Sequence, residues 1–201
     1  TGIALAISQL GKNSPLKAGF IGLGAGTLAA YGRTEDTYQF YELNPAVSQA
    51  ANQYFSYIKN SPAKIDIMLG DGRVSLTKQL KEGNKQQFNL LVIDAFSGDS
   101  IPQHLLTVEA LKIYWQHMTV DGVLAIHISN SHLNLLPLMR GLAIATSRQI
   151  RYFRTRSSNH TEHDTEWVWL TNNPKLLNNT LVKAYHSQWP EHSKKTVTWT
   201  D

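Results

Sequence analysis

The chain of 201 residues contains no cysteine, which excludes disulfides and thiolate metal sites and fits a reducing compartment. It has no apolar run approaching the ~20 residues of a membrane-spanning helix, and no signal-peptide succession of basic, apolar and small residues opens it. We therefore expect a cytoplasmic chain that makes no membrane contact of its own. Because the first residue is Thr1 and not methionine, we also expect a fragment of a longer chain, which could be the soluble domain of a membrane protein.

The chain also lacks a large excess of either charge, since 19 basic and 15 acidic residues leave a formal net charge of +4 at pH 7. Four arginines gather late in the chain, but no nucleic-acid-reading motif accompanies them. A solvated edge of the protein explains them, and we do not expect nucleic acid as a partner. These residues are Arg148, Arg151, Arg154 and Arg156.

What the sequence does contain is an alternation of short apolar runs with segments of helical spacing. Strands are predicted at residues 18–23, 37–43, 65–69, 88–93 and 123–128, and helices at 28–31, from Pro45 onward, and at 74–80, 108–117 and 133–146. This alternation predicts a doubly wound, mostly parallel sheet with right-handed crossovers.

Two further strands are predicted at residues 150–153 and 167–170, with residues 121–122 as a turn earlier in the chain. The pair places an antiparallel strand at one edge and completes the seven-stranded α/β, Rossmann-like layout of methyltransferases that use S-adenosylmethionine (SAM). Trp167 and Trp169 would then lie on an edge strand and face the core or a dimer surface. We expect one domain over residues 1–201, in which residues 171–201 form a loose C-terminal extension with a short helix near 176–185.

The first strand ends in a glycine-rich loop, at the carboxyl end of the sheet where doubly wound folds bind ligands. Glycines let the backbone turn sharply and approach a ligand closely, although a tight strand–helix turn needs them too. The loop departs from the G-x-G-x-x-G pattern of nicotinamide dehydrogenases, because Thr27 stands at the position of the third glycine. We interpret it as part of a SAM-type nucleoside site, with Gly22, Gly24 and Gly26 as cofactor-binding residues.

Three carboxylates follow the next three strands. Glu42 could accept both ribose hydroxyls, unless it is only a surface acid. Asp71, next to Gly72, could accept a hydrogen bond from the adenine amino group or cap the following helix, and the two roles are compatible. Asp94 follows a fully apolar strand, where a charge is costly unless it serves a site or ties a loop. We expect Glu42, Asp71, Gly72 and Asp94 to complete the cofactor site.

Three motifs stand at these positions: residues 41–45 (YELNP), 70–73 (GDGR) and, most specifically, 94–107 (DAFSGDSIPQHLLT). Together they resemble the spermidine synthase, or polyamine aminopropyltransferase, family over residues 2–153, in the bacterial branch found as the soluble C-terminal domain of membrane-embedded chains. The resemblance implies transfer of an aminopropyl group from decarboxylated SAM to an amine. It further implies that Glu42 binds the ribose, that Asp71 binds the adenine, and that Asp94 is the catalytic general base.

The chain departs from this family at two positions. Ala25 stands where the family carries an acid that pairs with the amine of decarboxylated SAM, and Ser97 stands where it carries a second aspartate that holds the diamine. Asp99 and His104 lie nearby in sequence, so the expected substrate-binding residues are Ser97, Asp99 and His104. An acid at position 25 would repel the carboxylate of ordinary SAM, so Ala25 suits SAM itself.

Three hypotheses on function follow. The first is a spermidine synthase-like transferase that uses SAM or decarboxylated SAM as cosubstrate and a small-molecule amine as acceptor. The second is a SAM-dependent methyltransferase with an unknown acceptor. The third is a non-catalytic nucleoside-binding domain that regulates an attached membrane region.

Three other features bear on these hypotheses. We expect no metal site, because His160 and His163 lack a third ligand of suitable spacing. His127 ends the fifth strand and could face the site, although a core histidine is the more common outcome. The family resemblance also suggests a homodimer.

Overall fold

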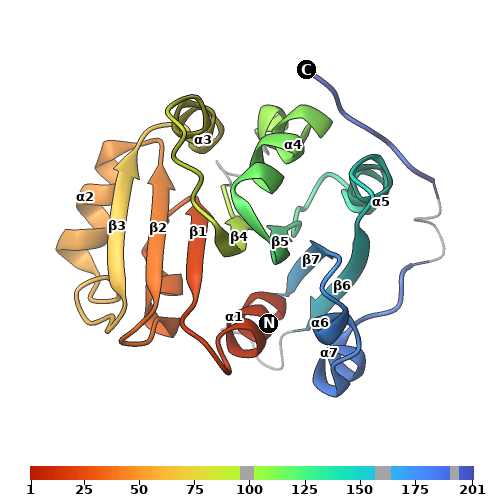
Figure 1. The fold of residues 1–201 in the computed structure, drawn as a ribbon, viewed down its shortest axis with the longest axis horizontal. Coiled ribbons are helices and arrows are strands. Elements are labelled where there is room, and N and C mark those ends of the chain that lie inside the picture. The colour runs from red at the N-terminus through yellow and green to blue at the C-terminus, as the bar shows by residue number, and fades with distance from the viewer. Residues whose placement is uncertain (96–101, 157–163, 191–194) are drawn as a thin grey trace.

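The computed structural model describes residues 1–95, 102–156, 164–190 and 195–201. Its strands are β1 Lys17–Ile21, β2 Thr37–Glu42, β3 Lys64–Leu69, β4 Phe88–Ile93, β5 Met118–His127, β6 Gln149–Thr155 and β7 Thr165–Thr171. In the described part of the chain these seven strands form one sheet in the order β3-β2-β1-β4-β5-β7-β6 (Figure 1). The first five strands are parallel neighbours, and the predicted doubly wound α/β sheet is confirmed.

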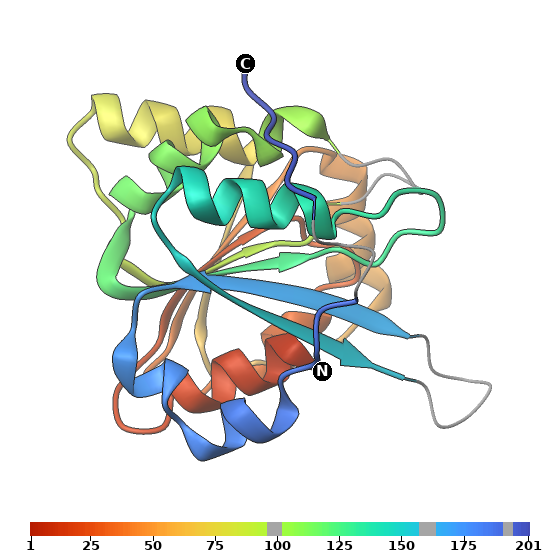
Figure 2. The same cartoon turned by 90° about the vertical axis from the view of Figure 1, so that its right-hand side faces the viewer.

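Helices cover both faces of this sheet. Figure 2 shows α3, α4 and α5 in one layer, with α1, α6 and α7 in the layer across the sheet. Helix α2 joins the second layer, because its Ala51 belongs to the same core cluster as Ala6 of α1 and Val182 of α7. The helices are α1 Gly2–Leu10, η1 Thr27–Tyr31, α2 Pro45–Tyr54, α3 Gly72–Lys81, η2 Gln103–Leu106, α4 Val108–Gln116, α5 Leu136–Ala145, α6 Pro174–Leu177 and α7 Thr180–Tyr185.

Strand β4 lies at the centre of the sheet, between β1 and β5. Its side chains alternate between two cores, since Leu91 packs with α3, α4 and α5 while Leu90 and Val92 pack with the opposite layer. All three side chains are fully buried. This explains why the strand is apolar at successive positions, as a strand covered on both faces must be.

Several boundaries differ from the sequence prediction. The predicted turn at residues 121–122 was wrong, because Asp121 and Gly122 lie inside β5, where the register with β4 shifts between Phe88 and Leu90. Helix α5 begins at Leu136 and not at residue 133, because the Asn130 carboxamide accepts the N–H of Leu133 and holds a turn before the helix. Helix α1 was not predicted at all.

The late strands also differ from the prediction. The antiparallel strand is β7, which lies between β5 and β6, so β6 and not β7 forms the edge. Trp167 and Trp169 on β7 are buried in the core beside α1, and the dimer-surface alternative for them was wrong. The ring of Trp169 packs against Phe153 of β6, with centroids 4.2 Å apart.

The C-terminal residues are attached to the fold. Two short helices, α6 and α7, replace the single predicted helix. Residues 195–201 then run over α5 and α4 (Figure 2). The N–H of Val197 donates to the carbonyl of Pro137, and the N–H of Val108 donates to the carbonyl of Trp199. Among the helices within the described ranges, none combines the length and apolarity that crossing a membrane requires.

Candidate functional site

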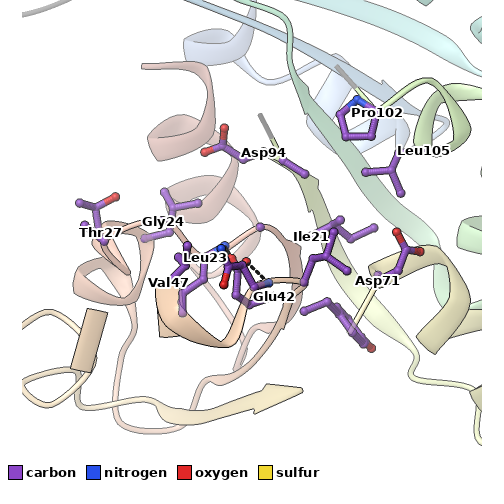
Figure 3. Close-up of a pocket in the computed structure, with 18 of the residues that line it drawn as sticks. Ile21, Leu23, Gly24, Thr27, Glu42, Val47, Asp71, Asp94, Pro102 and Leu105 are labelled. Carbon is purple, nitrogen blue, oxygen red and sulfur yellow. Dashed lines mark hydrogen bonds between the residues drawn. The ribbon is translucent and has the colours of Figure 1, made fainter. Parts of the chain in front are cut away.

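A pocket of about 600 Å³ opens at the carboxyl ends of the parallel strands, and a nucleoside-sized ligand fits this volume. Strand β1 has β2 on one side and β4 on the other, so the direction in which the chain adds strands reverses at β1. The pocket lies at this switch point of the doubly wound sheet. Figure 3 shows the residues around it. Of the predicted site residues, those that line it are Gly22, Gly24, Glu42, Asp71, Gly72, Asp94 and His104.

The glycine loop after β1 lines the pocket. Gly22 has φ +103°, and a Cβ atom there would lie 2.2 Å from the carbonyl oxygen of Asp94, so the close approach of the two strand ends requires a glycine. Gly26 was predicted to bind the cofactor, but it is not among the described lining residues. It instead precedes η1, where an added Cβ would meet Ile58.

Glu42 ends β2 and accepts hydrogen bonds from two segments that line the pocket. Its Oε2 accepts the N–H of Leu23 in the glycine loop at 3.0 Å, and its Oε1 accepts the N–H of Asn44 at 2.8 Å. Figure 3 shows Glu42 close to Leu23, with a dashed hydrogen bond at its carboxylate. The side chain is almost buried, and these two backbone donors support its charge. Each carboxylate oxygen has a second lone pair for a ligand hydroxyl, so the position is suited to a ribose.

Asp71 caps a helix with one carboxylate oxygen and meets His104 with the other. Its Oδ1 caps α3 by accepting the N–H of Val74 at 2.9 Å, and its Oδ2 lies 2.8 Å from Nε2 of His104. His104 reaches this point from η2, whose carbonyl at residue 104 accepts a hydrogen bond from Arg73. Arg73 pairs with Asp201, and this hydrogen bond raises the pKa of the guanidinium. These contacts connect the turn between β3 and α3 to η2.

Asp94 follows β4 and meets a partner that the sequence prediction missed. Its Oδ1 lies 2.8 Å from Nδ1 of His127, and Nε2 of His127 lies 2.8 Å from Oγ of Ser129. Of the two interpretations left open for His127, the contact with Asp94 and a partly exposed side chain favour the one in which it faces the site. Its place at the end of the strand beside β4 was the one signal for this pair. Ser97 and Asp99, the other predicted substrate-binding residues, lie outside the described residues, as do His160 and His163.

The pocket is acidic. Glu42, Asp71 and Asp94 all line it, and its described lining contains no lysine or arginine. A pyrophosphate would meet three carboxylates without a cationic partner, which disfavours a dinucleotide. A sulfonium or ammonium ligand would gain from the same charges. Within the described ranges, no group of three or more His, Asp or Glu side chains is arranged to hold a metal ion.

The rest of the described lining is mainly apolar and was not predicted individually. These side chains follow the strand ends, and they could cover the faces of a planar base. They include Ile21, Leu23, Leu28, Leu43, Val47, Ala95, Pro102 and Leu105. Tyr41 also contributes, and its buried phenol, whose pKa is raised by burial, donates to Gln79 at 3.0 Å.

The chain is similar in sequence to a curated transferase over about half of its length. No family model matches the chain. A polyamine aminopropyltransferase of Vibrio vulnificus (strain CMCP6) is 36% identical over 107 residues, which are 52% of this chain and 34% of the relative. The chain thus matches about a third of the length of this curated relative.

Two solved structures have the same fold. One is human methyltransferase-like protein 13 in complex with SAH, with a TM-score of 0.65 and 15% identity over 94% of this chain and 92% of that one. The other is spermidine synthase from Thermotoga maritima, with a TM-score of 0.65 and 17% identity over 94% of this chain and 70% of that one. The chain is therefore spermidine synthase-like in sequence and has the fold shared by spermidine synthases and SAM-dependent methyltransferases.

Proposed function

We propose that this chain is a spermidine synthase-like transferase that binds SAM or decarboxylated SAM and, with decarboxylated SAM as donor, transfers an aminopropyl group to a small-molecule amine. The observation that carries the proposal is the acidic lining of a pocket at the glycine loop, with no lysine or arginine among its described residues. Such a pocket favours a positively charged sulfonium nucleoside over phosphorylated nucleotides. The sequence similarity to a polyamine aminopropyltransferase supports the same substrate class.

Three carboxylates would divide the ligand among them. Glu42 would accept the ribose hydroxyls, since its two oxygens already face the loop and the start of α2. Asp71 would accept the adenine amino group with the oxygen that now meets His104. Asp94 lines the same pocket, and its backbone carbonyl lies against Gly22. Its carboxylate would then lie beside the sulfonium.

The reaction needs little beyond alignment and a base. The amine nitrogen attacks the methylene carbon bonded to the sulfonium sulfur, the carbon–sulfur bond breaks, and its electron pair returns to sulfur. The nucleoside leaves as a neutral thioether, so no acid catalyst is required. The attacking amine must be neutral, and Asp94 would receive the proton that it loses.

Methyl transfer from SAM is the second candidate, and one observation favours it. Ala25 lines the pocket and leaves the loop without the acid that would pair with the amine of decarboxylated SAM. The carboxylate of ordinary SAM meets no repulsion at that position. The two reactions differ only in which carbon on sulfur the acceptor attacks.

Incubation with decarboxylated SAM and putrescine, read by mass spectrometry, tests the proposal. We expect spermidine and methylthioadenosine in equal amounts, and we expect Asp94→Asn to abolish both while nucleoside binding remains. A protein that binds the nucleoside but forms no spermidine would refute aminopropyl transfer. Methylated acceptor from SAM would then support the second candidate, and binding without either transfer would support a regulatory domain.

A further inference from the structure

A hydrogen-bonded chain of three side chains lies at the carboxyl ends of β4 and β5. Ile93 and Ile126 are register partners in the parallel pair, so Asp94 and His127 follow them side by side. Oδ1 of Asp94 lies 2.8 Å from Nδ1 of His127, and Nε2 of His127 lies 2.8 Å from Oγ of Ser129. The chain ends on the backbone, because the N–H of Glu166 donates to Oγ of Ser129 at 2.7 Å.

For a neutral imidazole beside an ionised Asp94, the partners select the direction of each hydrogen bond. An ionised carboxylate has no proton to donate, so Nδ1 of His127 carries the proton and donates it to Asp94. Nε2 is then an acceptor, and the Ser129 hydroxyl donates to it. The N–H of Glu166 occupies an acceptor site of the same hydroxyl, which leaves its proton directed at His127. This arrangement selects one tautomer of the imidazole.

Packing holds the imidazole in place. His127 pairs with Trp167 across the antiparallel β5–β7 ladder, and their rings stack with centroids 4.7 Å apart at an angle of 15°. On another side it lines a small cavity of about 10 Å³ together with apolar residues, namely Ile93, Ala95, Pro102, Leu105, Leu106 and Ile126. Rotation of the ring away from Asp94 would lose the stack and both hydrogen bonds together. The orientation of Asp94 is therefore coupled to a rigid element of the sheet.

We propose that His127 is a positioning residue for Asp94, with Ser129 fixing its tautomer. This inference rests on the proposed function, in which Asp94 is the general base. The Nδ1–H of His127 donates to Oδ1 of Asp94 and holds that oxygen in place. The second carboxylate oxygen is thereby directed to the amine. His127 does not touch the reacting atoms, and it acts through Asp94 alone.

Two matched variants separate positioning from packing. His127→Asn keeps an N–H donor near the place of Nδ1, whereas His127→Phe keeps a flat ring on Trp167 and loses the donor. We expect His127→Phe to lower kcat about a hundredfold, the effect that misplacing a reacting group by about 1 Å has in enzymes. KM for the nucleoside and the melting temperature should stay near the wild-type values. His127→Asn should recover most of kcat.

The opposite pattern would overturn the inference. Equal kcat in His127→Phe and the wild type would exclude positioning through the hydrogen bond. A loss in His127→Asn as large as that in His127→Phe would mean that the donor to Asp94 is not what matters. Ser129→Ala provides a third comparison, with a smaller loss of kcat expected because the imidazole can then adopt either tautomer.

A second readout does not depend on transferase activity. Nitrogen-15 NMR of the His127 imidazole should show a protonated Nδ1 and an unprotonated Nε2, and Asp94→Ala should remove this preference. If the wild-type protein transfers no group, the proposed function has failed, and this spectrum still decides separately whether His127 donates to Asp94. A protonated Nε2 with an unprotonated Nδ1 in the wild type would overturn it.

Discussion

Glu42 accepts the backbone N–H of Leu23 at 3.0 Å, across 19 residues of sequence. The bond joins the end of β2 to the glycine loop that follows β1. The carboxylate that we propose as the ribose acceptor therefore also holds the glycine loop that lines the same pocket.

Glu42→Gln should therefore weaken ligand binding more than it weakens the fold. The amide retains the size of the side chain but loses the charge that strengthens its hydrogen bonds. We expect the Kd for a SAM-type nucleoside to rise about 10- to 100-fold, the equivalent of one hydrogen bond to a charged group. Calorimetric titration measures this change, with the exposed Glu35→Gln as the matched control. An unchanged Kd in Glu42→Gln would remove Glu42 from the ligand site.

Asp71→Asn separates the helix cap from base recognition. Asparagine caps helices about as well as aspartate, so the melting temperature should change little. The neutral side chain should distinguish less well between an adenine amino group and a hypoxanthine carbonyl. We expect the preference for methylthioadenosine over methylthioinosine to shrink several-fold, as measured by competition binding. A preference equal to that of the wild type would contradict the assignment of Asp71 to the adenine.

Gly22→Ala tests the close approach of β1 and β4. The added Cβ would lie 2.2 Å from the carbonyl oxygen of Asp94, at a residue with φ +103°. We expect a loss of more than about 2 kcal/mol in the free energy of unfolding, since both the backbone conformation and the contact are unfavourable. Gly83→Ala is the control, because its φ is +74° with no atom within 4 Å of the added Cβ, and it should cost only about 1 kcal/mol. Equal losses in urea unfolding would show that the contact is unimportant.

His117 should make the stability depend on pH. Burial lowers its pKa in the folded protein, and its ring lies between the carbonyl of Leu76 and the N–H of Gln86. As the pH falls through about 6.5, the unfolded chain takes up a proton that the folded protein does not, so the folded state loses stability toward acid. Urea unfolding at pH 7.5 and at pH 5.5 should differ less in His117→Gln than in the wild type. The exposed His186→Gln should retain the full difference, and an unaltered pH dependence in His117→Gln would contradict this origin.

The sequence predicted the sheet and the gathering of three carboxylates at one pocket for one physical reason. A continuous apolar run such as β4 can be recognised from the sequence as a buried strand. The residues at the carboxyl end of each parallel strand then lie at the edge of the sheet where doubly wound folds bind ligands. The carboxylates of Glu42, Asp71 and Asp94 could therefore be assigned to one pocket without coordinates.

The sequence could not predict contacts that depend on register and strand order. The pairing of His127 with Asp94 requires β5 to lie beside β4 in one particular register. The burial of Trp167 follows from the insertion of β7 between β5 and β6, which local alternation does not reveal. Gly26 was assigned to the ligand by its place in a glycine-rich loop, yet an added Cβ would meet Ile58, beyond α2 in sequence.

The central claim is that the acidic pocket at the glycine loop binds a sulfonium nucleoside. Its most direct test is calorimetric titration of the wild-type chain with SAM, decarboxylated SAM and methylthioadenosine, with NAD as the anionic comparison. We expect a submillimolar Kd for at least one of the two sulfonium nucleosides and no measurable binding of NAD. If neither sulfonium nucleoside binds below the millimolar range, or if NAD binds more tightly than both, the pocket is not a sulfonium nucleoside site.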